Sequence, residues 1–117
     1  MSRVLRGEIW RVRLNPTDGD EIQKARPCLI VSSDHVGKLR LRVVVPLTEW
    51  RDSFRTVPWM VQIDPDRGNG LAKASAADAF QVRSVSVQRF VEKCGVVSDE
   101  QLQDVVAAVG IVLEITP

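Results

Sequence analysis

Arg26 is the residue whose type and position best suit it to chemistry. It follows a polar loop over residues 15–25 and stands directly before Pro27. Proline biases the preceding residue toward an extended backbone, so Arg26 has less conformational freedom to lose when it binds an anion. Its guanidinium is a planar fork of donors that matches phosphate, and long loops on rigid sheets frequently carry binding groups. The residues alone also allow an ordinary surface arginine beside a turn.

The other reactive residue types exclude several classes of enzyme. The single histidine, His35, rules out a mechanism that needs two imidazoles, and it is expected to be a solvated loop residue. No cluster of His, Cys, Asp and Glu has metal-ligand spacing, so we expect neither a metal ion nor another cofactor. Cys28 and Cys94 lie far apart within apolar surroundings and are expected to be buried free thiols.

Composition places the chain among globular proteins and limits its partners. The 117 residues are the length of one domain and no linker interrupts them, so a single domain over residues 1–117 is expected. No apolar run reaches the ~20 residues of a membrane-spanning helix and no signal core is present, which predicts a cytoplasmic protein without a membrane partner. Sixteen Lys and Arg against fifteen Asp and Glu leave a net charge of +1, so nucleic-acid binding would need a local basic patch.

The patterning of the chain predicts short strands that would hold Arg26 in place. Residues 8–14 alternate between apolar and charged, as in a half-buried strand, and residues 28–33 form a continuous apolar run typical of a central strand. Further strands are expected over 39–45, 57–63, 71–75, 79–85 and 91–97, with polar loops over 15–25, 34–38 and 47–56 and one helical turn over 86–89.

A helix is expected to close the chain. Ser98 and Gln101 match a capping box, in which each side chain bonds the other residue's backbone amide. The apolar residues that follow fall on one stripe: Leu102, Val105, Val106, Val109 and Leu113. Short strands followed by one helix predict a mostly β fold, a small and strongly bent antiparallel barrel with the helix packed on it.

Many of these residues belong to a longer pattern at fixed spacing. In one-letter code, residues 7–32 read G-E-I-W-x-V-x-L-x-P-x-x-G-x-E-x-x-K-x-R-P-x-L-I-V-S. The pattern resembles the MazF/PemK (Kid) toxins of bacterial type II toxin–antitoxin systems. The resemblance continues through residues 45–48 (V-P-L-T), 70–71 (G-L), 81–85 (Q-V-R-S-V) and the helix start S-D-E-Q-L, and so covers nearly the whole chain.

The resemblance implies both a fold and an activity. The fold would be an SH3-like barrel of the CcdB/MazF type. The activity would be that of a homodimeric, metal-independent endoribonuclease that cuts single-stranded RNA at short motifs, leaving a 2′,3′-cyclic phosphate and a 5′-hydroxyl. A cognate antitoxin would block it with an extended acidic segment. The family's loop glutamate, loop-end arginine and strand-end threonine fall on Glu21, Arg26 and Thr48.

These residue types suit such a reaction. The RNA supplies its own nucleophile, the 2′-hydroxyl, so the protein must remove one proton, stabilise the phosphorane charge and assist departure of the 5′-oxygen. Arg26 can grip two phosphoryl oxygens. Thr48 can donate its hydroxyl to a non-bridging oxygen or relay a proton, and Glu21 can act as the base or orient Arg26.

One position departs from the family's pattern. Some PemK-type members have a carboxylate immediately before the Gln-x-Arg motif, where this chain has Phe80, and its nearest acid is Asp78. On the strand expected there, residues two apart share a face, so Asp78 and Phe80 should point together. This favours the Arg26/Thr48 scheme and leaves Glu21, Thr48 or Asp78 as the base. Phe80 is expected in the core, with stacking on a base as the alternative.

Other side chains are candidates for binding the RNA. Gln81 and Arg83 are expected to read a base or a phosphate, and Trp50 can stack on a base, whereas Trp59 is expected in dimer or core packing. The basic rim is expected from three loop residues: Lys24, Arg51 and Arg55.

Two rival functions remain open to the sequence. A barrel module that binds RNA or protein without cutting is opposed only by the Arg26, Glu21 and Thr48 set. A gyrase-directed toxin of the same fold would act through a C-terminal Trp-Gly-Ile, whereas residues 113–117 read L-E-I-T-P.

Overall fold

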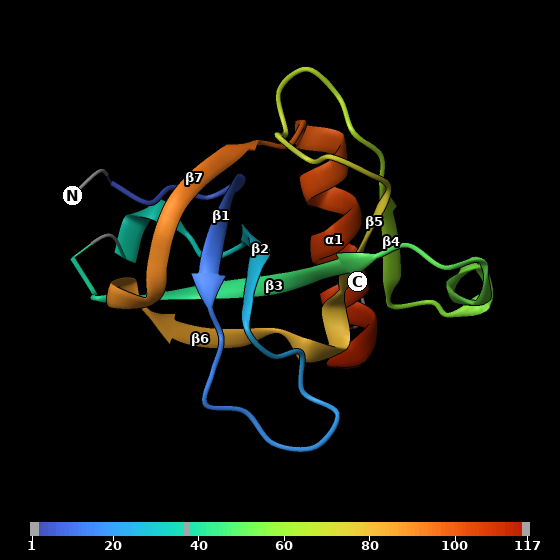
Figure 1. Ribbon diagram of the computed structural model, residues 1–117, viewed down its shortest axis with the longest axis horizontal. Coiled ribbons are helices and arrows are strands. Elements are labelled where there is room, and N and C mark those ends of the chain that lie inside the picture. Colours follow the sequence, from blue (N-terminus) through green and yellow to red (C-terminus); the bar gives the residue numbers. More distant parts are fainter. Residues whose placement is uncertain (1–2, 37, 116–117) are drawn as a thin grey trace.

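The computed structural model describes residues 3–36 and 38–115 of the chain. Seven strands precede a single long helix in this part of the protein (Figure 1). The strands are β1 (Glu8–Arg13), β2 (Ala25–Ile30), β3 (Leu41–Glu49), β4 (Met60–Ile63), β5 (Ser75–Asp78), β6 (Arg83–Ser86) and β7 (Phe90–Val96). Four 3-10 turns, η1 (Asp34–Val36), η2 (Asp52–Thr56), η3 (Ala79–Gln81) and η4 (Val87–Arg89), lie between them, and helix α1 (Asp99–Val112) follows.

The strands form one strongly bent antiparallel sheet in the order β4-β5-β3-β2-β1-β7. Its bend is produced by β3, which pairs with β6 through residues 41–44, with β2 through 44–46 and with β5 through 47–49. One long strand therefore belongs to both halves of the sheet. The sheet does not close, and the result is an open barrel with α1 packed on one side (Figure 1), which confirms the fold predicted from the sequence.

Strand β3 separates two apolar cores because its side chains alternate between faces. Val44 belongs to the core inside the barrel, and Val45 and Leu47 belong to the core beneath α1. The barrel core also holds Val4, Trp10, Val12, Leu14, Cys28, Ile30, Val85 and Phe90. The helix core also holds Ile9, Leu29, Ile63, Ala77, Val97, Leu102 and Val105.

The helix begins as its sequence predicts. The Ser98 hydroxyl accepts a hydrogen bond from the Gln101 amide at 3.1 Å, and the Gln101 side chain accepts one from the Ser98 amide at 3.0 Å. Leu102 and Val105 are buried and pack on the sheet. The expectation that Leu113 completes the stripe is wrong, because α1 ends at Val112 and the Leu113 side chain is 58% exposed.

Several strand boundaries differ from those expected, and two differences bear on the site. Strand β2 starts at Ala25 and includes Pro27, which is tolerated because Pro27 pairs with β1 alone, while pairing with β3 begins at Cys28. Strand β3 runs on to Glu49, so the loop expected from residue 47 begins later. Residues 79–81 are a 3-10 turn in place of the expected strand, and residues 71–74 are a loop, since β5 starts at Ser75.

The predictions about cysteine and histidine are confirmed with one exception. Both cysteines are free thiols and Cys28 is buried as expected, but Cys94 is only half-buried, so the expectation of a second buried thiol is wrong. Burial raises the pKa of Cys28 to about 12, so this thiol stays protonated at neutral pH. His35 is exposed in η1. Within the described residues no helix is long and apolar enough to cross a membrane.

Candidate functional site

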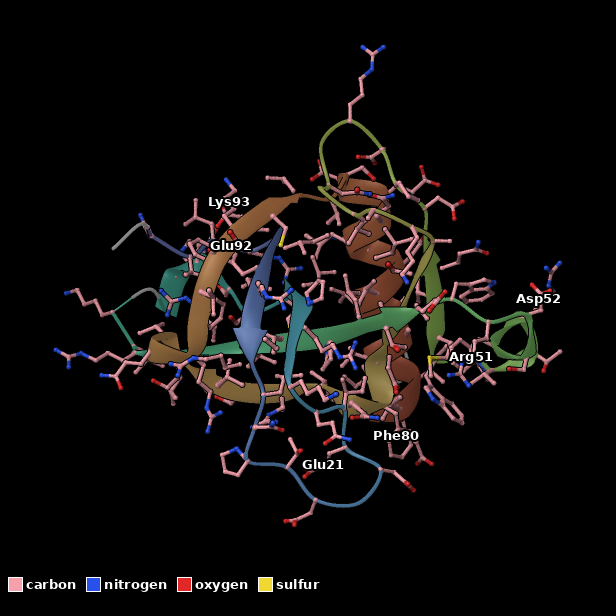
Figure 2. All side chains as sticks on the ribbon, in the orientation of Figure 1. Glu21, Arg51, Asp52, Phe80, Glu92 and Lys93 are labelled. Carbon is pink, nitrogen blue, oxygen red and sulfur yellow. The ribbon has the colours of Figure 1, made fainter. Side chains whose placement is uncertain are left out.

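A groove of about 500 Å³ lies where the β1–β2 loop meets η3 and the start of β6. Figure 2 shows two of its residues, Glu21 on the loop and Phe80 on η3, on the same side of the molecule. The lining residues come from the loop, from β3 and from residues 80–83: Asp20, Glu21, Ile22, Pro46, Phe80, Gln81, Val82 and Arg83. The groove therefore combines apolar surface with charged and amide groups, as small binding sites commonly do.

Arg26 and Thr48 lie at the same end of the ladder that joins β2 and β3. The last pair at that end is Cys28 with Pro46, and Arg26 and Thr48 each lie two residues beyond it, where β3 pairs with β5. Pro46 lines the groove, whereas Arg26 and Thr48 do not. The strands therefore bring the predicted arginine and threonine to one end of this ladder, next to a groove residue.

The surroundings of the two side chains differ. Arg26 is exposed, and its Nε donates to the Gln23 carbonyl at 3.2 Å, which leaves both terminal nitrogens without a partner among the described residues. Thr48 is half-buried, and its backbone pairs with Ala76 of β5. Strand β3 therefore carries the hydroxyl, and the neighbouring strand β2 carries an exposed guanidinium with two unused amino groups. Such a guanidinium is suited to grip a phosphate.

Glu21 lines the groove and also stabilises the loop that carries it. One of its carboxylate oxygens, Oε1, accepts a hydrogen bond from the Asp18 amide at 2.6 Å, and the Glu21 amide donates to the Asp18 carbonyl at 3.1 Å. The other oxygen, Oε2, accepts no hydrogen bond from any residue that the structure describes. No contact joins Glu21 to Arg26 within that part of the chain, so the loop turn uses one oxygen of this carboxylate and leaves the second available.

Gln81 is fully occupied by contacts to the β1–β2 loop. Its side-chain oxygen accepts from the Ile22 amide at 2.6 Å, and its nitrogen donates to the Asp20 carbonyl at 3.2 Å and to Asp78 Oδ2 at 3.2 Å. An amide group offers two N–H donors, and both are used here. Gln81 therefore holds the loop against η3, a role that the sequence did not reveal.

Asp78 and Phe80 do not share a face, contrary to the sequence prediction. Asp78 is buried at the end of β5, and its Oδ1 accepts from the Phe80 amide, which starts the 3-10 turn η3. The turn rotates Phe80 outward, so its ring is 61% exposed and the expectation of a core aromatic is wrong. The ring contacts Trp59 at a centroid distance of 5.4 Å.

Burial raises the pKa of Asp78 above its ordinary value of 3.8. Hydrogen bonds from the Phe80 amide and from Gln81 oppose this effect without cancelling it. Asp78 is absent from the groove lining and contacts groove residues through the Gln81 side chain and the Phe80 amide.

The remaining cations predicted to bind RNA are spread over three places. Arg83 lines the groove, is half-buried, and donates to the Leu14 carbonyl at 3.2 Å. Arg51 and Arg55 lie at η2, beyond the groove, where Arg55 pairs with Asp52 at 3.4 Å; Figure 2 shows Arg51 and Asp52 well apart from Glu21. Lys24 lies on the other side of the β1–β2 loop.

Sequence reasoning missed Asp20, Ile22, Pro46 and Val82 as groove residues. Pro46 stands within the V-P-L-T match, which was the available signal, whereas the contact of the loop with residues 80–83 left no trace in local patterning. Among residues 3–36 and 38–115, no group of three or more His, Cys, Asp or Glu side chains is placed to hold a metal ion.

Comparison with known proteins shows to which family the chain belongs. Residues 5–113 match the model of the "PemK-like, MazF-like toxin of type II toxin-antitoxin system". The chain belongs to this family. Among curated relatives, the endoribonuclease MazF9 of Mycobacterium tuberculosis is 31% identical over 94% of this chain and 96% of its own length. The endoribonuclease PemK of Escherichia coli is 38% identical over 74% of this chain and 64% of its own length.

Solved structures share the fold of this PemK/MazF family member. MazF from Deinococcus radiodurans superposes with a TM-score of 0.82 at 21% identity, covering 98% of this chain and 100% of that one. An endoribonuclease from a mycobacterial species, solved in complex with its cognate antitoxin, superposes with a TM-score of 0.76 at 23% identity, covering 97% of this chain and 98% of that one. Both are therefore open barrels of this architecture.

Proposed function

We propose that this PemK/MazF-family endoribonuclease toxin cleaves single-stranded RNA at short sequence motifs, without a metal ion, leaving 2′,3′-cyclic phosphate and 5′-hydroxyl ends. The observation that supports the proposal is the position of Arg26 and Thr48, each two residues beyond the Cys28–Pro46 pair that ends the β2–β3 ladder, with Pro46 lining the groove. A guanidinium and a hydroxyl carried by neighbouring strands suit a phosphate whose negative charge grows in the transition state.

The reaction needs few groups from the protein. The 2′-oxygen of the RNA attacks the phosphorus, and the bond from phosphorus to the 5′-oxygen breaks. One proton passes from the 2′-hydroxyl to a base, and solvent water gives a proton to the departing 5′-oxygen. Arg26 holds the phosphoryl oxygens through its two unused amino groups. Thr48 donates its hydroxyl to a non-bridging oxygen.

Glu21 is the proposed base. Its Oε2 is available at the groove, whereas Asp78 is buried and already accepts hydrogen bonds on both oxygens. Arg83 and the exposed Phe80 ring then bind the neighbouring nucleotides, one by charge and the other by stacking.

We propose further that the protein acts in the cytoplasm as a homodimer and is inhibited by a cognate antitoxin that lays an extended acidic segment across the groove. A groove of about 500 Å³ on one small barrel holds few nucleotides, and pairing two barrels would lengthen it. Arg83, which lines the groove, and the exposed Arg26 suit an acidic segment as well as RNA.

The test uses purified protein, a mixed-sequence single-stranded RNA and EDTA, followed by chemical analysis of the RNA ends. We expect cleavage with cyclic phosphate ends. Arg26→Ala should lower the cleavage rate about 100- to 1000-fold, because it removes donors aimed at developing charge, while the fold is retained because Arg26 is exposed. Arg67→Ala, which removes an exposed cation from the β4–β5 loop, is the matched control and should cut normally.

Three results would reject the mechanism: cleavage that requires added metal, ends of another kind, or a folded Arg26→Ala protein that cuts at the normal rate. RNA that is bound but left uncut by the wild-type protein would support the rival function, a barrel module that binds RNA without catalysis.

A further inference from the structure

A second groove, of about 600 Å³, lies on the other side of the β1–β2 loop. Its lining comes from the end of β1, both ends of the loop, the start of β2, the end of β6 and the turn η4. The polar residues are Arg13, Asn15, Lys24, Ser86, Gln88 and Arg89. Ala25 is the one apolar residue in the lining.

Three cations and no acid line this second groove. The ion pairs formed by the described residues use other cations, Arg55, Lys73 and Lys93, so Arg13, Lys24 and Arg89 keep their charges uncompensated. A cluster of like charges is unfavourable by itself. Such a cluster suits an anion that binds there.

The two arginines are oriented by backbone carbonyls, which hold a guanidinium without neutralising it. Arg89 Nη1 donates to the Arg13 carbonyl at 3.0 Å and to the Asn15 carbonyl, and Arg13 Nη2 donates to the Gln88 carbonyl at 2.7 Å. Nε and one terminal nitrogen of each arginine, and the Lys24 ammonium, have no partner in the described part of the chain. The groove thus presents oriented, unused donors.

We propose that this second groove binds phosphate groups of the RNA strand that flank the nucleotides in the first groove. The inference rests on the proposed function, since it extends the same substrate. Contacts from Arg and Lys together with Ser, Asn and Gln side chains are those that position a nucleic-acid backbone without reading its bases.

The lining favours RNA over an acidic peptide. Peptide segments are usually anchored by apolar side chains in apolar pockets. The first groove offers such surface through Ile22, Pro46 and Phe80, whereas the second offers only Ala25.

The two grooves lie along one stretch of chain, so one strand of RNA can reach both. Residues 80–83 line the first groove and residues 86–89 line the second. The three residue steps along β6 from Arg83 to Ser86 span about 10 Å at ~3.3 Å per residue. The same stretch also holds the start of the loop, because Arg83 bonds the Leu14 carbonyl and Arg89 bonds the Asn15 carbonyl.

The experiment compares two lengths of single-stranded 2′-O-methyl RNA, which lacks the nucleophile and stays uncut. An oligonucleotide of about 4 nucleotides is long enough to occupy one groove, and one of about 16 nucleotides is long enough to occupy both. The double variant Arg13→Gln/Lys24→Gln changes two exposed side chains and spares Arg89, which holds the loop. Arg67→Gln is the matched control for loss of charge.

For the long oligonucleotide, we expect the double variant to bind about tenfold more weakly at low salt. The slope of log affinity against log salt should fall by about 1.4, at ~0.7 per phosphate contact on a single strand. Binding of the short oligonucleotide, and both affinities of Arg67→Gln, should match the wild type.

Unchanged affinity and salt slope for the long oligonucleotide would overturn the inference, while normal cleavage of ordinary RNA by the same proteins would keep the proposed function. An effect equal for both lengths would also overturn it. The inference would also fail if the double variant bound a poly-glutamate peptide more weakly than the wild type but bound RNA normally. The second groove would then be a binding site for an acidic peptide. Failure of the wild type to cut RNA would instead reject the proposed function.

Discussion

The two long loops of the sheet are held in different ways, although each connects two neighbouring strands in the chain order. The β4–β5 loop (residues 64–74) is held mainly from within. Asn69 is fully buried, accepts hydrogen bonds from the Asp66 and Leu71 amides and donates to the Asp64 carbonyl. Gly70 packs so closely on β7 that a Cβ atom there would lie 2.0 Å from the Cys94 carbonyl oxygen.

The β1–β2 loop (residues 14–24) is held both by its own exposed side chains and from outside. Within the loop, the Asn15 and Glu21 side chains accept hydrogen bonds from the Lys24 and Asp18 amides. Gln81, Arg83 and Arg89 reach its backbone from the segment around β6. The loop's own charged side chains therefore remain exposed, and those of Glu21 and Lys24 line the two grooves. In this protein, a loop fixed by its own buried side chain is part of the scaffold, and one fixed by another segment is free to bind a ligand.

The largest expected effect is the difference in stability between the same glycine-to-alanine substitution made in each of the two loops. Gly70→Ala combines a positive φ of 71° with the clash against the Cys94 backbone, so we expect a loss of more than about 4 kcal/mol of unfolding free energy and little folded protein. Gly19→Ala in the β1–β2 loop has a φ of 52° but no atom within 4 Å of the added carbon, and should cost only about 1–2 kcal/mol. Urea denaturation measures both, and equal losses would contradict the comparison.

Asn69→Ala tests the internal fixation of the β4–β5 loop. It leaves three backbone groups without their partner, and we expect the unfolding free energy to fall by about 3 kcal/mol, since each unsatisfied buried group costs roughly 1–3 kcal/mol and some will find water. Cleavage per folded molecule should stay normal, because the loop lies away from both grooves. A variant that is stable but inactive would show that this loop also takes part in function.

Gln81→Ala tests the external fixation of the β1–β2 loop. The released groups are the Ile22 amide and the Asp20 carbonyl, in an exposed loop that water can reach, and Oδ2 of the buried Asp78. We therefore expect stability to fall by about 1–3 kcal/mol. The rate constant for cleavage should fall roughly 10- to 100-fold, because small displacements of a positioned group are costly to catalysis. Single-turnover kinetics at saturating RNA, with circular dichroism melting, measure the two effects. A normal rate constant would remove Gln81 from the positioning of the loop.

The pH dependence of stability gives the smallest expected effect. Burial raises the pKa of Asp78, so the folded state binds its proton more tightly than the unfolded state does. The resulting stabilisation is complete below the ordinary value of 3.8 and is lost as the pH rises through the folded pKa. Asp78→Asn removes this dependence, so the stability of the variant relative to the wild type should increase as the pH rises from below about 3.8. Parallel curves in urea denaturation over this range would contradict the raised pKa.

The sequence by itself determined the elements whose causes are local. Alternation of apolar and charged residues specified β1, the Ser98–Gln101 capping box specified the start of α1, and the fixed spacing around Arg26 specified the family. These features can be predicted from the sequence because each depends on residues only a few positions apart, the range over which strand alternation and helix capping act.

Tertiary structure alone decided how the site is assembled. The Gln81 side chain meets Ile22 across 59 residues, and Arg89 meets Arg13 across 76, so no local pattern could predict either contact. Phe80 turned outward because the Asp78 side chain caps a 3-10 turn where alternation predicted a strand. The positions of the cations also depend on tertiary structure. The bend of β3 carries η2, with Arg51 and Arg55, away from the first groove. The pairing of β1 with β2 places Arg13 beside Lys24 in the second groove.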